Sequence, residues 1–317
     1  MRFMRYCGMS RQIVFIHGVA DITKSWRRLA PLVENIGYSV DFFEYKTLDR
    51  QLNLTTIAQQ LAEFIDRRNY TDLVLMGHSQ GGLVAEWYDH FLTQDRPIEK
   101  IITIATPYHG NIAPALTQRR LLALAPISRA QLKHLSFCSE PLRRLMEVRR
   151  LGGTATPYFA IAGMIGKRMG YESDGVVPVV SANRNAIYHL KSNHEYETIV
   201  DSSTRTFFIR KNHLPASFLY GSRRPESEFM TILHKILLNH TLKDKEIDAQ
   251  FAALIIQKSI LSNCKFASYK SIRKPAWSVD EAYCVFYGNT GTLETLRVDG
   301  IQIDVLPGRV TYILGTP

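Results

Sequence analysis

The sequence contains little of what marks several classes of protein. Its few cysteines are far apart and form no CxxC pair, so they predict neither a zinc site nor a disulfide framework: Cys7, Cys138, Cys264 and Cys284. No apolar run approaches the roughly 18 to 20 residues that a membrane-spanning helix needs. The segment 1–10 is too short and too polar to hold a signal peptide. We therefore expect a reducing compartment, cytoplasmic by default, although export by another route stays open.

What the chain does contain is enough apolar sequence for a large core. Of its 317 residues, 45% are hydrophobic and 21% are charged, which is typical of a globular protein rather than a disordered one. The formal net charge is +10, which favours anionic partners such as a membrane surface. No recognition-helix or aromatic-basic strand pattern accompanies the charge, so no nucleic-acid partner is expected.

Short buried-looking runs alternate with helical segments along the first 240 residues. The runs are rich in β-branched and aromatic residues: 12–16, 38–45, 72–76, 100–104, 157–162 and 204–209. The clearest helical spacing is that of Ile57, Leu61 and Phe64. The segment is expected to open with a capping box of Thr56 and Gln59. This order predicts the α/β class, with a mostly parallel sheet covered by helices on both faces.

Two regions break the alternation. Residues 111–156 form a mostly helical insertion, which we interpret as a cap within a catalytic domain of residues 1–240. After His240, the sequence predicts a helix around Gln250–Leu261 and then a β-meander with turns at Asn289–Gly291, Asp299–Gly300 and Pro307–Gly308. Residues 241–317 are therefore expected to be a small appendage that packs on the core.

The strongest chemical signal is a G-x-S-x-G pattern, Gly77-His78-Ser79-Gln80-Gly81, followed by Gly82. An apolar strand precedes it and a helical segment follows it, which is the setting of a nucleophile elbow. The sharp turn strains the serine and exposes its hydroxyl, while the glycines remove Cβ atoms that would collide. The N–H of Gln80, at the helix start, can face the oxyanion of an acyl intermediate.

With this motif the chain resembles the α/β-hydrolase superfamily, and within it the bacterial lipases and PGAP1-like acyl hydrolases. The resemblance spans about residues 12–240. It rests on the motif above and on Ile13-Val14-Phe15-Ile16-His17-Gly18, Ala105-Thr106-Pro107-Tyr108-His109-Gly110 and Ser173-Asp174-Gly175-Val176-Val177-Pro178. The sequence lacks the triple-glycine oxyanion loop of another lipase subgroup. The sheet is expected to begin with the strand at 12–16, without a preceding hairpin, which is similar to the shortened sheet of the bacterial lipases.

The resemblance implies a serine hydrolase triad, because a serine needs a histidine base and the base needs a carboxylate. It implies Ser79 as nucleophile, Asp174 as acid, and the backbone N–H of Val19 as the second oxyanion donor beside Gln80. His213 matches the family's base, in a loop after the last predicted strand. The gap from Asp174 to His213 is longer than in bacterial lipases, so the polar stretch Ser192–Ser203 reads as an insertion. His194 is the alternative base if that stretch is the catalytic loop.

Three earlier histidines lie near the expected pocket. His17 and His78 flank the oxyanion region and precede the acid in sequence, so a structural role is favoured for both. His109 follows the strand after the nucleophile helix, and it either lines the acyl pocket or is an ordinary loop histidine.

The cap combines basic residues with leucines, which suits contact with an anionic membrane. The segment from Asn111 to Arg150 contains eight Lys and Arg residues and two acidic residues, which gives a net charge of +6. A solvated cap with ordinary packing leucines explains the same pattern.

We thus predict a serine acyl-ester hydrolase acting on lipids, without a metal or organic cofactor. The alternatives are an acyltransferase, or a thioesterase or small-ester esterase, with the same triad. A third is a hydrolase scaffold that binds ligands without turnover.

Overall fold

A computed structural model describes most of the chain in sixteen stretches. They are residues 11–19, 26–27, 29–47, 49, 51–68, 70–93, 98–111, 129–165, 172–192, 195–213, 228–242, 251–261, 264–266, 283–289, 296–303 and 305–315.

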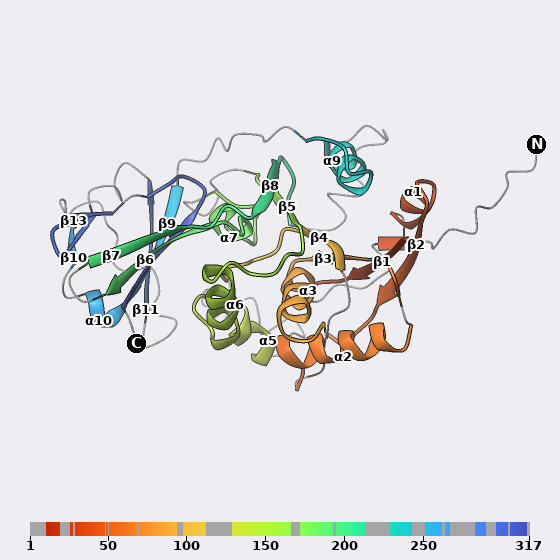
Figure 1. Cartoon of the computed structure of the whole chain (residues 1–317), viewed down its shortest axis with the longest axis horizontal. Coiled ribbons are helices and arrows are strands. Elements are labelled where there is room, and N and C mark those ends of the chain that lie inside the picture. The colour runs from red at the N-terminus through yellow and green to blue at the C-terminus, as the bar shows by residue number, and fades with distance from the viewer. Residues whose placement is uncertain are drawn as a thin grey trace, which may run out of the picture.

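The main sheet has six parallel strands in the order β2-β1-β3-β4-β5-β8 (Figure 1). Their bounds are β1 Arg11–Ile16, β2 Tyr38–Phe43, β3 Leu73–His78, β4 Ile98–Ile104, β5 Tyr158–Gly163 and β8 Thr204–Ile209. Each overlaps a run that the sequence predicted. All six strands run parallel, so their carboxyl ends meet at one edge of the sheet.

Helices cover both faces of this sheet because its strands are apolar on both sides. On β1, Val14 and Ile16 join the core under α2 (Leu54–Asp66), α3 (Gln80–Phe91) and α6 (Glu140–Arg150). Ile13 and Phe15 join the core under α1 (Ala30–Glu34) and α9 (Glu228–Leu237). Figure 1 shows the two helix groups on opposite sides of the strands. The predicted α/β architecture with helices on both faces is confirmed.

The N-cap of helix α2 lies three residues before the predicted one, Thr56. Asn53 is this N-cap, and the Asn53 side chain accepts the backbone N–H groups of Thr55 and Thr56. The Thr56 hydroxyl in turn accepts the N–H of Asn53, so Thr56 is the third helical residue. The predicted capping box of Thr56 and Gln59 was therefore wrong, because the asparagine upstream satisfies the first amides of the helix.

A second, mixed sheet of five strands lies beside the first, in the order β11-β9-β14-β6-β7. Its strands are β6 Ala186–Ser192, β7 Glu195–Val200, β9 Phe251–Gln257, β11 Tyr283–Asn289 and β14 Val310–Gly315. Strands β6 and β7 precede residue 240 and the other three follow it, with β14 parallel to both β6 and β9. The division into units at residue 240 stays a prediction, but the two parts share one sheet.

The helix predicted around Gln250–Leu261 was wrong over most of its length. Phe251–Gln257 is strand β9, and only Lys258–Leu261 forms a helix, α10. Ala252 and Ile256 are fully buried. A short apolar run of this kind fits a buried strand or a buried helix equally by periodicity. In the structure β9 pairs with β11 on one edge and with β14 on the other, and this pairing specifies a strand.

The tail also differs from the predicted meander, because β9 and β14 are parallel neighbours. A small separate sheet, of order β10-β12-β13, completes the described tail: β10 Cys264–Phe266, β12 Leu296–Val298 and β13 Ile301–Gln302. Its hairpin turns at Asp299 and Gly300, both with positive φ, as predicted for that dipeptide. A turn also lies at Pro307–Gly308.

The described part of the cap comprises α5 (Arg129–His134) and α6, and residues 112–128 lie outside the described chain. Leu142, Leu145 and Met146 of α6 are buried in the protein core, so they offer no apolar face to a membrane. The Arg149 side chain is fully buried, and Arg150 pairs with Glu147 at 2.6 Å. Ordinary packing thus accounts for these leucines, and membrane contact stays a prediction.

Within the described residues, no helix is long and apolar enough to cross a bilayer.

Candidate active site

Ser79 sits on the tight turn between β3 and α3, at the carboxyl edge of the main sheet. Its backbone has φ 52° and ψ −123°, a conformation that costs energy for a residue with a side chain. Ser79 is 8% exposed. The strained turn lifts the hydroxyl out of the strand and the helix, which is the geometry of a nucleophile elbow.

The glycines of the motif are required by close packing. A Cβ on Gly77 would lie 2.4 Å from the nitrogen of Gly82, and a Cβ on Gly81 would lie 2.2 Å from the carbonyl oxygen of Ile16. A Cβ on Gly82 would lie 2.0 Å from the hydroxyl oxygen of Thr106. The turn can therefore close against β1 and the loop after β4 only where these side chains are missing.

His213 lies between Ser79 and Asp174. Its Nε2 is 3.0 Å from the Ser79 hydroxyl oxygen, and its Nδ1 is 2.8 Å from Oδ2 of Asp174. The carboxylate accepts a hydrogen bond from the Nδ1–H of the neutral ring, which leaves a lone pair on Nε2 that faces the serine. The three side chains thus form a continuous hydrogen-bonded chain.

Asp174 is held by its own loop and is 1% exposed. Its Oδ1 accepts the backbone N–H groups of Val176 and Val177 at 2.9 and 2.7 Å. Its backbone carbonyl accepts the N–H of His213 at 2.9 Å. These bonds fix one carboxylate oxygen and leave the other for the histidine ring.

Sequence reasoning missed the contribution of Gly163, the last residue of β5. A Cβ there would lie 2.5 Å from the carbonyl oxygen of Lys211 and 2.9 Å from Cβ of Asp174. Only glycine lets the acid loop and the histidine loop approach so closely. The available signal was a glycine directly after the predicted strand 157–162, ahead of the loop that holds the acid.

The predicted oxyanion residues lie on two segments that meet at Ser79. A Cβ on Gly18 would lie 2.9 Å from Cβ of Ser79, so the segment His17–Val19 passes directly over the nucleophile. Gln80 is the first residue of α3 and is fully buried. An N–H in the first turn of a helix has no carbonyl partner within the helix, so it is available to an anion.

His78 supports the histidine loop. Its Nε2 donates to the backbone carbonyl of His213 at 2.8 Å, and the two rings are 5.1 Å apart. Burial, together with the nearby His213 ring, lowers the pKa of His78 to about 3. His78 is therefore neutral at ordinary pH and acts as a hydrogen-bond donor to the base's backbone.

His17 and His109 have structural partners. The Nδ1 of His17 donates to the carbonyl of Gly18 at 3.0 Å, and its Nε2 accepts the N–H of Tyr45 at 3.3 Å. The Nε2 of His109 donates to the carbonyl of Asn183 at 2.9 Å, and its Nδ1 accepts the hydroxyl of Tyr312 at 2.8 Å. Both nitrogens of His109 are occupied, so it links the two sheets and has none left to face an acyl pocket.

The alternative base, His194, lies outside the described residues. His194 falls in the long stretch of sequence between Asp174 and His213, and the structure explains the length of this stretch. The stretch Ser192–Ser203 belongs largely to the hairpin of β6 and β7, which joins the second sheet. The added residues therefore serve the second sheet while His213 stays beside Ser79.

Beneath the nucleophile helix lies a buried ion cluster that the sequence did not indicate. Glu86 of α3 accepts two hydrogen bonds from Arg149, at 2.8 and 2.5 Å, and one from Arg184, at 2.7 Å. All three side chains are at most 2% exposed. Burial alone would raise the pKa of Glu86, but the two guanidinium groups outweigh it and hold the pKa well below the usual value.

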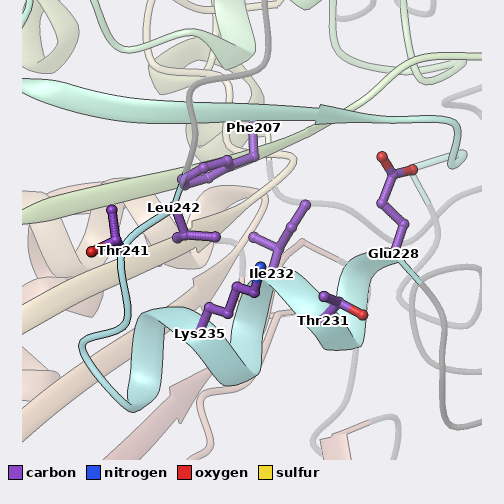
Figure 2. Close-up of a pocket in the computed structure, with 7 residues that line it drawn as sticks. All are labelled: Phe207, Glu228, Thr231, Ile232, Lys235, Thr241 and Leu242. Atoms are coloured by element: carbon purple, nitrogen blue, oxygen red, sulfur yellow. The ribbon is translucent and has the colours of Figure 1, made fainter.

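A cavity of about 520 Å³ opens between β8 and α9, away from these residues. Figure 2 shows Phe207, Ile232 and Leu242 at its apolar wall, with Glu228 and Lys235 on α9. None of the predicted site residues lines it, so it is separate from the candidate site. The described residues contain no group of three or more side chains suited to holding a metal ion.

Comparison with solved structures gives a match over nearly the whole chain. Phospholipase PlaB from Legionella pneumophila superimposes with a TM-score of 0.67 at 12% identity, covering 96% of this chain and 93% of PlaB. The same enzyme in complex with thio-NAD also gives 0.67, at 13% identity. The fold is that of the α/β-hydrolases.

Two further comparisons agree with this α/β-hydrolase fold. The mature lipase BlEst2 from Bacillus licheniformis has a TM-score of 0.52 at 19% identity, covering 72% of this chain and 92% of that one. Residues 9–126 match the model of the PGAP1-like alpha/beta domain. No curated protein sequence matches the chain. The chain thus has the α/β-hydrolase fold that the resemblance predicted, and it shares this fold with a phospholipase and a lipase.

Proposed function

We propose that the protein is a serine hydrolase that cleaves carboxylic esters of lipids, with Ser79, His213 and Asp174 as its triad. The observation that carries the proposal is the position of His213, whose ring nitrogens lie 3.0 Å from the Ser79 hydroxyl and 2.8 Å from the Asp174 carboxylate. These distances are within the range for direct proton transfer. The strained backbone of Ser79 supports the same role.

In this mechanism the Ser79 oxygen attacks the ester carbonyl while Nε2 of His213 takes the hydroxyl proton. Asp174 stabilises the imidazolium that forms, and the N–H groups of Val19 and Gln80 hold the oxyanion. As the tetrahedral intermediate collapses, the ester C–O bond breaks and His213 gives its proton to the leaving alcohol. Water, deprotonated by His213, then attacks the acyl-serine, and release of the acid restores the Ser79 hydroxyl.

The likeness to phospholipase PlaB and to lipase BlEst2 favours a lipid as the source of the ester. The PlaB match includes the second sheet, since it covers 96% of this chain. At 12% identity the likeness is one of fold, so the lipid class is the part of the proposal that most needs a direct test.

The test is product analysis on phosphatidylcholine vesicles, a triglyceride emulsion and p-nitrophenyl butyrate. The wild type should release fatty acid from at least one lipid, and Ser79→Ala should lose activity by at least about 1,000-fold. Ser136→Ala is a matched control, because Ser136 is also 8% exposed and its hydroxyl donates to the backbone carbonyl of Leu132 at 3.1 Å. It should keep full activity.

The other outcomes separate the remaining functions. Hydrolysis of the short ester alone would overturn the lipid class and leave an esterase. Acyl transfer to an added alcohol or thiol in preference to water would indicate an acyltransferase. Equal activity of Ser79→Ala and wild type, or no turnover on any ester, would overturn the serine mechanism.

A further inference from the structure

Several interactions around the segment His17–Val19 come from a residue that the mechanism does not use, Tyr45. It lies just beyond the end of β2, next to the carboxyl end of β1. Tyr45 is 7% exposed and His17 is 2% exposed. Their rings stack in parallel, with centroids 4.1 Å apart and an interplanar angle of 10°. The pair is therefore a packed unit directly under the segment that crosses Ser79.

Tyr45 determines which nitrogen of His17 carries the proton. The backbone N–H of Tyr45 points to Nε2 of His17 at 3.3 Å, so Nε2 is an acceptor. The ring proton of the neutral imidazole must then be on Nδ1, where it is donated to the carbonyl oxygen of Gly18 at 3.0 Å. The hydrogen bond to Nε2 thus fixes the tautomer in which Nδ1 donates to the Gly18 carbonyl.

The bond to the Gly18 carbonyl fixes the direction of the Val19 N–H. Both atoms belong to the same planar, trans peptide unit, in which the C=O and the N–H point in opposite directions. Since His17 holds the carbonyl oxygen on its own side, the Val19 N–H must face the opposite side. A glycine at position 18 would otherwise allow this peptide unit to rotate.

The hydroxyl of Tyr45 adds a second constraint on the same loop. It donates to the backbone carbonyl of His17 at 2.9 Å and lies 3.4 Å from Oε1 of Gln80. Gln80 supplies the other proposed oxyanion donor. Tyr45 therefore contacts both segments that would bind the oxyanion, without touching the reacting atoms itself.

We propose that the Tyr45 hydroxyl and the His17 ring together position the Gly18–Val19 peptide. The hydroxyl holds the His17 carbonyl and the ring holds the Gly18 carbonyl, so that the Val19 N–H faces the oxyanion. The proposal rests on the proposed function, because it presumes a serine mechanism with Val19 and Gln80 as donors. Its effect is on the transition state, in which the carbonyl oxygen carries negative charge, and not on binding of the neutral ester.

The test compares Tyr45→Phe with a matched variant, Tyr38→Phe. The hydroxyl of Tyr38 is also buried and donates to a backbone carbonyl, that of Leu237 at 2.8 Å, but at the opposite end of β2. Each variant loses one buried hydrogen bond to a backbone carbonyl, so the two should melt at similar temperatures. We expect kcat on p-nitrophenyl butyrate to fall about 10-fold in Tyr45→Phe, with KM within twofold, and to stay within twofold in Tyr38→Phe.

A trifluoromethyl ketone provides a second readout, since its addition to Ser79 creates an oxyanion at the same place. Its inhibition constant should rise about 10-fold in Tyr45→Phe and should not change in Tyr38→Phe. Equal kinetics of the two variants would overturn the proposal. A wild type with no ester turnover would overturn the proposed function instead, and this inference with it.

A second pair of variants keeps the test decisive if Tyr45→Phe does not fold. In His17→Asn the side-chain amide nitrogen takes the place of Nδ1 and can still donate to the Gly18 carbonyl, whereas in His17→Gln it takes the place of Nε2. We expect His17→Asn to keep several-fold more kcat than His17→Gln at a similar melting temperature. The reverse order, or equal kcat values, would contradict the assigned orientation.

Discussion

The two larger sheets differ in how much of their structure is local in sequence. In the main sheet, helices α1, α2 and α3 join the strands from β1 to β4, the cap lies between β4 and β5, and the hairpin of β6 and β7 lies between β5 and β8. All six strands run parallel. The second sheet pairs β6, at residues 186–192, with β14, at residues 310–315. Every residue of the proposed triad and oxyanion hole lies in a segment that follows a main-sheet strand. The proposed chemistry therefore belongs to the main sheet, and the second sheet is attached to it through buried contacts.

The largest expected effect comes from breaking the buried ion cluster of Glu86, Arg149 and Arg184. Arg149→Met leaves the buried Glu86 with one guanidinium partner, so we expect a loss of about 3–5 kcal/mol in the free energy of unfolding. The neighbouring Arg150 pairs with the half-exposed Glu147, and Arg150→Met should cost under about 1 kcal/mol. Chemical denaturation of both variants measures the difference. Equal losses would show that the buried ion cluster stabilises the fold no more than the surface pair does.

A smaller effect should appear as a pH dependence of stability. Burial lowers the pKa of His109 to about 3, with Arg149 adding to the shift, so the folded protein keeps this ring neutral. The unfolded chain takes up a proton near pH 6.5, so stability is lost as the pH falls below that value. Between pH 7 and pH 5 we expect this group to contribute a loss of about 2 kcal/mol.

The variant His109→Asn isolates that contribution, because it removes the titrating ring at the contact with Tyr312. Its free energy of unfolding should fall less steeply than that of the wild type between pH 7 and pH 5, as measured by urea titration at each pH. Parallel curves for the two proteins would mean that His109 is not held neutral between the sheets.

The smallest effect tests whether the second sheet takes part in the chemistry. Tyr312→Phe removes the hydroxyl that donates to His109, at a cost of about 1 kcal/mol in unfolding free energy. We expect kcat and KM on p-nitrophenyl butyrate to stay within twofold of the wild type. A tenfold fall in kcat without loss of fold would show that the second sheet positions the active site.

The same contrast explains what could be predicted from the sequence. The main sheet follows from local patterns, because fully apolar runs alternate with helical spacing, and Ser79 has a motif tied to a strand and a helix. His213 and Asp174 required the family resemblance, since nothing local connects a turn aspartate with a loop histidine. The structure brings His213 beside Ser79 and Asp174 beside His213.

The second sheet could not be predicted, because its pairings are long-range. Phe251–Gln257 has no pattern that separates a strand from a helix, and only its partners β11 and β14 specify its structure. The tautomer of His17 is a similar case. It depends on Tyr45, 28 residues away in sequence, and no pattern in the chain relates the two.

The central claim is that His213 activates Ser79 as a nucleophile, and intact-mass analysis after treatment with a fluorophosphonate tests it most directly. The wild type should gain one adduct, on the peptide that contains Ser79, and His213→Ala should react at least about 1,000-fold more slowly while keeping its melting temperature. An adduct on another residue, or equal labelling rates for wild type and His213→Ala, would contradict the account.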